Sequence, residues 1–191
     1  MGRIDLSEEN YSDAMYNFNK AIIAKPKDFE GYFLRGIAKY SLNDYIGAVN
    51  DFTKTLELHP LYVRAYHYRG VANDRLGNYA DAKKDYSKAI ALDPFDAELH
   101  IAMGSTKMHL NEFENAISSF DTAIIINPNN ANAYIYVIHL FHIGGILLRR
   151  NVIAPFISRS RNHRCGSTIR RRCLQGFRLI FTNKVRIDQC R

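Results

Sequence analysis

Prolines recur every 34 residues along most of this 191-residue chain, at Pro26, Pro60, Pro94 and Pro128. The residues around each proline recur with it, so the chain contains several copies of one structural unit. A period of this length is typical of solenoids, in which each unit buries its apolar face against its neighbours. Aligned on the prolines, the chain divides into a partial unit (1–28), three complete units (29–62, 63–96 and 97–130), a degenerate fourth copy (131–145) and a tail (146–191).

Small and aromatic residues return at fixed offsets within each unit. A glycine stands in the first half of the unit, and an alanine followed by an aromatic residue stands in the second half. Small residues let two helices approach closely, and aromatic rings fill the space around the contact. Each proline ends a helix, because it disfavours the α conformation in the residue before it. The predicted structural positions are Gly36, Gly70, Gly104, Ala48, Ala82, Ala116, Pro60, Pro94 and Pro128.

The order aromatic-x3-Gly, Ala-x3-aromatic and Pro, repeated every 34 residues, resembles the tetratricopeptide repeat. The resemblance covers residues 1 to about 143. It implies an all-α fold, a right-handed solenoid of antiparallel helix pairs, and a protein–protein interaction scaffold that needs no cofactor. The sequence has no Gly-rich phosphate loop, no nucleophile motif and no metal-spaced histidines, so we do not expect an enzyme.

The resemblance also implies where a partner binds. In this family the first helix of each unit lines a concave groove through its second, fifth, ninth and twelfth positions. The side chains at these positions suit a peptide or a helical segment of another protein. A second interpretation is that some of them pack inside the superhelix. The family's clamp for a C-terminal carboxylate is not expected, since Phe33 and Ile37 occupy two of its positions. The predicted groove residues are Phe33, Ile37, Tyr40, Arg64, His67, Val71, Asp74, Ile101, Ser105 and Met108.

One position departs from the family pattern. The residue before the glycine is usually leucine in the family, but two units of this chain have arginine there and the third has methionine. The facing position on the second helix changes in step, from aspartate to serine. We therefore predict one ion pair within each of two units, although independent solvated charges are the alternative. The predicted pairs are Arg35–Asp51 and Arg69–Asp85, and the third unit has Met103 and Ser119.

The charge changes sign where the repeats end. Residues 1–145 have 14 Lys+Arg and 18 Asp+Glu, a net charge of −4, whereas residues 146–191 have 12 and 1, a net charge of +11. We expect this Arg-rich tail to be disordered. It is either an arm that binds nucleic acid or an anionic membrane, or translated sequence that was never selected as protein. The spacing of His163, Cys165, Cys173 and Cys190 is not that of a zinc site, so no metal is predicted.

The degenerate fourth copy continues into an apolar run that ends at Leu148. The run has about 16 residues, fewer than the roughly 20 needed to span a bilayer, so a membrane span is not expected. We expect a terminal helix with an uncovered apolar face, and hence self-association through residues 131–148. The N-terminus carries no signal peptide, which favours a cytoplasmic location. The first copy begins in mid-repeat, so an upstream extension of the natural chain is an alternative to a short cap.

Overall fold

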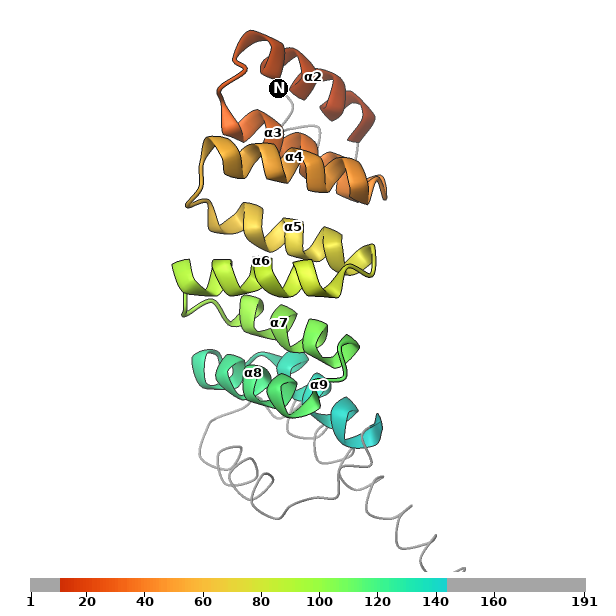
Figure 1. Ribbon diagram of the computed structural model, residues 1–191, viewed down its shortest axis with the longest axis vertical. Helices are drawn as coiled ribbons and strands as arrows, with labels where there is room; N and C mark the ends of the chain where they lie inside the picture. The colour runs from red at the N-terminus through yellow and green to blue at the C-terminus, as the bar shows by residue number, and fades with distance from the viewer. Residues whose placement is uncertain (1–10, 144–191) are drawn as a thin grey trace, which may run out of the picture.

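The computed structural model describes residues 11–143, and these fold into α-helices stacked along one axis (Figure 1). Each complete unit forms one antiparallel pair of helices, which confirms the predicted all-α solenoid. Some predictions concern residues 1–10 and 144–191, which lie outside the described residues. These are the predictions for the basic tail, its cysteines and the end of the apolar run. The helices are α2 (Tyr11–Ala24), α3 (Phe29–Ser41), α4 (Tyr45–Leu58), α5 (Val63–Arg75), α6 (Tyr79–Leu92), α7 (Ala97–His109), α8 (Phe113–Ile126) and α9 (Ala131–Ile143).

Aspartates begin several of these helices. The Asp28 carboxylate accepts a hydrogen bond from the backbone N–H of Glu30 (3.1 Å), and Asp96 accepts the equivalent bond from Glu98 (2.9 Å). Asp44 begins α4 in the same way. These bonds satisfy N–H groups that have no partner inside the helix. The polar residues between the units therefore set where each helix starts.

The turn inside each unit needs a left-handed residue. Asn43, Gly77 and Asn111 occupy equivalent positions, with φ of 63°, 77° and 59°. Glycine and asparagine adopt this conformation more readily than other residues. The turns within the units therefore have a specific backbone requirement, which allows the second helix to fold back on the first.

The recurring glycines lie where the two helices of a unit cross. A β-carbon at Gly36, Gly70 or Gly104 would lie 2.6, 2.7 or 2.5 Å from a ring carbon of the second helix. The rings concerned belong to Phe52, Tyr86 and Phe120. The three recurring alanines, Ala48, Ala82 and Ala116, are fully buried. Each second helix ends two residues before its proline, at Leu58, Leu92 and Ile126.

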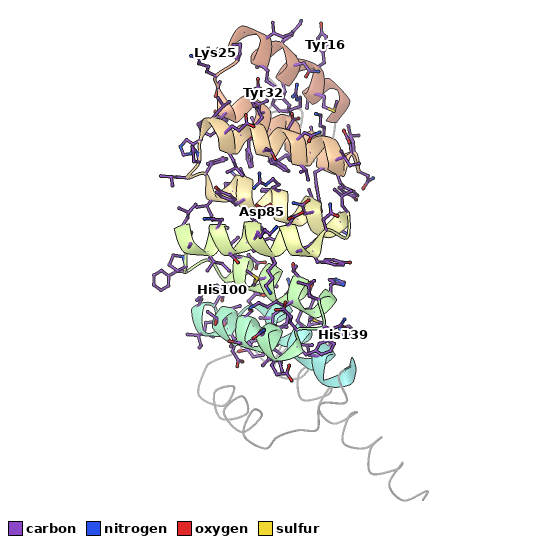
Figure 2. All side chains as sticks on the ribbon, in the orientation of Figure 1. Tyr16, Lys25, Tyr32, Asp85, His100 and His139 are labelled. Carbon is purple, nitrogen blue, oxygen red and sulfur yellow. The ribbon has the colours of Figure 1, made fainter. Side chains whose placement is uncertain are left out.

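In three copies of the unit, the residue at the fourth position of the first helix contacts the preceding proline. The hydroxyl groups of Tyr32 and Tyr134 donate to the carbonyl oxygens of Pro26 (3.3 Å) and Pro128 (3.0 Å). His100 has the equivalent place, and its Nε2 lies 3.0 Å from the Pro94 carbonyl oxygen. Figure 2 labels Tyr32 and His100, which lie near the same side of the stack. Histidine thus replaces tyrosine here without loss of the contact.

Both predicted ion pairs are present. Arg69 donates from Nε and Nη2 to the two carboxylate oxygens of Asp85, at 2.9 and 2.6 Å. Asp85, labelled in Figure 2, lies between α5 and α6 in the middle of the stack. Arg35 binds Asp51 in the same two-bond geometry, at 2.8 and 2.5 Å. The alternative, independent solvated charges, is therefore wrong.

The array curves toward its first helices. Besides the contacts between sequential helices, α3 contacts α5, α5 contacts α7, and α7 contacts α9. Among the described helices, no two second helices of successive units come into comparable contact. Closer spacing on one side of a stack bends it toward that side. The inner, concave surface is therefore formed by α3, α5, α7 and α9.

The last described helix, α9, has both buried and exposed apolar residues. Ala133, Val137 and Leu140 of α9 are buried against α7 and α8, but Ile135 is 59% exposed. Among residues 11–143 no helix is long and apolar enough to cross a membrane. The self-association of residues 131–148 stays a prediction, since the second part of that segment lies outside the described residues.

Candidate interaction groove

Two of the predicted groove residues belong to the core. Phe33 and Ile101 are only 1% and 6% exposed. The ring of Phe33 packs against those of Tyr62 and Tyr68, with centroids 4.9 and 5.7 Å away, so the next unit covers it. Neither residue offers a surface to a partner, which corrects the sequence prediction for these two positions. The second interpretation, packing inside the superhelix, holds for them.

The other predicted groove residues keep part of their surface accessible. Arg64 is exposed, and the remainder are half-buried. They come from three first helices that contact one another on the inner side of the array, so the fold brings them onto one continuous surface. The half-buried residues are Ile37 and Tyr40 on α3, His67, Val71 and Asp74 on α5, and Ser105 and Met108 on α7.

His67 is a neutral side chain at the fifth position of α5. Burial lowers the pKa of its imidazole below the ordinary value; the charges of Asp96 and Glu98 oppose part of this decrease, and the charge of Arg64 adds to it. Its ring lies 5.6 Å from the Tyr68 ring and 6.1 Å from the Tyr86 ring, between centroids. A neutral imidazole among aromatic rings extends the apolar part of the groove.

Asp74 links three helices. Its carboxylate accepts hydrogen bonds from the hydroxyl groups of Tyr86 on α6 (2.8 Å) and Thr106 on α7 (2.9 Å). Burial raises the pKa of Asp74, and these two hydrogen bonds offset only part of the increase. Burial raises the pKa of Tyr86, and the Asp74 carboxylate raises it further. Asp74 therefore serves the packing between units as well as the groove surface.

We expect Asp74→Asn to stabilise the fold near neutral pH. Because the folded-state pKa of Asp74 lies above the unfolded value, stability is lost as the pH rises from the unfolded-state pKa through the folded-state pKa. Asparagine keeps an oxygen that accepts from Tyr86 and Thr106 but carries no charge. The difference between variant and wild type in free energy of unfolding should shrink as the pH falls toward 4. Urea titrations at several pH values measure it, and parallel pH profiles would contradict the prediction.

Tyr40 and Arg75 form one end of the groove. Arg75 donates from Nε to the Tyr40 hydroxyl, at 3.2 Å, and this bond raises the pKa of the guanidinium. The Tyr40 ring packs against Tyr45, with centroids 5.3 Å apart. Arg75 was not among the predicted groove residues. It is the thirteenth residue of α5, and the four positions implied by the family resemblance end at the twelfth. Its contact with an adjacent unit could not be read from local sequence.

Among residues 11–143, no three His, Cys, Asp or Glu side chains gather as a metal site would require. The histidines His67, His100 and His109 are each in contact with a neighbouring ring or carbonyl group. The inner surface carries both apolar and polar side chains.

Two family models, both described as tetratricopeptide repeat, match residues 63–96 and 97–130. Residues 63–130 of the chain are tetratricopeptide repeats. The tetratricopeptide matches cover the second and third complete units. No curated protein sequence matches the chain.

Solved structures share the tetratricopeptide-repeat fold of this chain. MamA is 19% identical, covers 95% of this chain and 97% of its own, and superposes with a TM-score of 0.75. YrrB, described as having an unusual peptide-binding site, is 23% identical over 69% of this chain and 68% of its own (TM-score 0.65). The first TPR of Spaghetti (RPAP3), bound to the HSP90 peptide SRMEEVD, is 21% identical over 60% and 90% (TM-score 0.58).

Proposed function

We propose that this protein is an interaction scaffold, not an enzyme, and that it binds a segment of a partner protein along the inner surface of α3, α5 and α7. The proposal rests on the row of accessible side chains on three successive first helices, of which α3 contacts α5 and α5 contacts α7. Membership of a repeat family with peptide-bound relatives such as the RPAP3 repeat supports it. The partner is proposed to be a protein.

The chemistry of the surface suits a segment with apolar side chains. Ile37, Val71 and Met108 come from successive first helices and are half-buried. An apolar side chain laid on them would remove further apolar area from water on both partners. Tyr40 and Ser105 lie on the same helices and supply hydroxyl groups that can bind the backbone of the segment.

A charge placed on this surface tests the proposal. Peptides are selected from a displayed library on the purified wild-type chain and then measured against Val71→Glu. We expect affinity to fall at least tenfold, because a carboxylate on the apolar strip would be desolvated by the bound peptide. Ser105→Glu, at a polar position of α7, should show the same loss with less risk to the fold.

Ile46→Glu is the matched control. Ile46 lies on the second helix α4 and is 65% exposed, so its replacement adds the same charge away from the groove. The selected peptides should bind this variant as they bind wild type, and all variants should keep their helical circular dichroism. Equal binding by Val71→Glu, Ser105→Glu and wild type would refute the groove assignment.

A further inference from the structure

The arginines of the described residues fall into two classes. Arg35 and Arg69 are each bound to a buried aspartate. Arg64 and Arg75, both on α5, are exposed, and among the side chains that the structure describes neither guanidinium forms an ion pair with a carboxylate. The groove of one unit therefore carries two cations that are not neutralised by the fold.

Arg64 and Arg75 lie on the same side of α5. They are eleven residues apart in the sequence, which is close to three helical turns, so their α-carbons share one face and lie about 16 Å apart. Both are held by α3 of the preceding unit. The Arg64 guanidinium carbon lies 5.1 Å from the centroid of the Phe33 ring, and Arg75 donates to the Tyr40 hydroxyl. These contacts orient the two cations at opposite ends of the inner face of α5.

The remaining donors of these arginines are available to a ligand. Arg75 uses only Nε in its bond to Tyr40, which leaves its two Nη groups. A guanidinium presents such donors in a planar fork that fits a carboxylate. Val71 lies between the two arginines on α5 and is half-buried. Along this face of α5, an apolar side chain, Val71, therefore lies between two cations, Arg64 and Arg75.

The acidic groups nearby are already engaged. Asp74 accepts hydrogen bonds from Tyr86 and Thr106. Glu98, at the second position of α7, accepts from the Asn130 side chain at 2.7 Å. They reduce the local positive potential but do not pair with either arginine. The free cations on this face thus favour an anionic ligand.

We infer that the partner segment is acidic and extended, with two carboxylate side chains four residues apart that bind Arg64 and Arg75. This rests on the proposed function and names the chemistry of the partner. Four residues of extended chain span about 13 Å and place both side chains on one side, and the long arginine side chains cover the remaining distance. The residue midway between them faces Val71, where an apolar side chain fits. The binding determinants are internal side chains, not a chain end.

Fluorescence anisotropy with defined peptides tests the inference. The probe is the labelled, acetylated and amidated peptide Ser-Gly-Glu-Ala-Leu-Ala-Glu-Gly-Ser, and its control has Gln in place of both Glu. We expect the Gln peptide to bind about 100-fold more weakly. Arg64→Gln and Arg75→Gln should each weaken binding of the acidic peptide about tenfold, or about 1.4 kcal/mol. Higher salt should weaken it further.

Lys88→Gln provides the matched loss of one positive charge. Lys88 is exposed on the second helix α6, so its removal should leave the affinity unchanged. Equal binding of the Glu and Gln peptides, no binding of either, or an equal effect of Lys88→Gln would overturn the inference. Preference for a helical peptide with its two Glu residues eleven apart would overturn the extended form. If library-selected peptides still lose affinity on Val71→Glu in any of these cases, the groove assignment stands without the acidic specificity.

Discussion

Replacing Arg69 by methionine should lower the free energy of unfolding by about 3–5 kcal/mol, because it leaves a buried carboxylate without its partner. Asp85 is 5% exposed and receives two hydrogen bonds from the guanidinium. The weak contact from the Asn73 side chain, at 3.4 Å, cannot replace them. Urea denaturation followed by circular dichroism measures the loss.

The third unit provides the control for this prediction. It has Met103 and Ser119 at the positions of Arg69 and Asp85, and Ser119 is bonded to Lys107 at 2.9 Å. The double variant Arg69→Met with Asp85→Ser should therefore recover most of the stability that the single variant loses. Lys54→Met, which removes an exposed cation paired with Glu57, should change little. Additive effects of the two substitutions would show that the pair is not coupled.

Gly36→Ala should destabilise the fold by about 1–3 kcal/mol, the usual range for overpacking a core. In an unconstrained helix the same change is favourable by about 1 kcal/mol, since alanine is the better helix former. Here the new β-carbon would lie 2.6 Å from a ring carbon of Phe52, which is fully buried. The steric term is therefore expected to exceed the gain in helix propensity.

A smaller partner should relieve this clash. Phe52→Leu alone leaves space at the crossing of α3 and α4, and Gly36→Ala should cost less in that background than in the wild-type chain. Thermal or urea unfolding of the four chains of the double-mutant cycle gives the coupling energy. A Gly36→Ala variant more stable than wild type would show that the helix crossing tolerates a methyl group.

The ion pairs could be predicted because the repeats supply an internal comparison. Three copies of one unit show which positions change together, and the change from Arg and Asp to Met and Ser connects residues 16 apart in the sequence. The glycine and alanine positions follow from the same alignment. Periodicity thus identifies contacts within a unit, since each unit repeats them.

Contacts between units were harder to predict, because they depend on how far each unit overlaps the next. The fifth position of the first helix shows this: Phe33 and Ile101 are buried, while Ile135 is 59% exposed. Its exposure depends on whether a following unit covers it. Asp74 has partners on two other helices, so no local pattern could place it. The one feature of the sequence that could have indicated a partner for Asp74 was the hydroxyl of Tyr86, since the other units have phenylalanine at this position.

The arginines before the glycines also join one unit to the one before it. Besides its bonds to Asp51, Arg35 donates from Nη1 to Asn19 at 2.7 Å, and Arg69 donates in the same way to Thr53 at 3.1 Å. Methionine at 103 has no such donor.

The junction between the unit 63–96 and the unit 97–130 has other polar contacts, Lys83 of α6 with Glu112 before α8 and Asp74 of α5 with Thr106 of α7. In a linear array, cooperativity is the sum of such nearest-neighbour couplings. An arginine before the glycine therefore adds one polar coupling through which the unfolding of one unit affects its neighbour, and its omission removes that coupling.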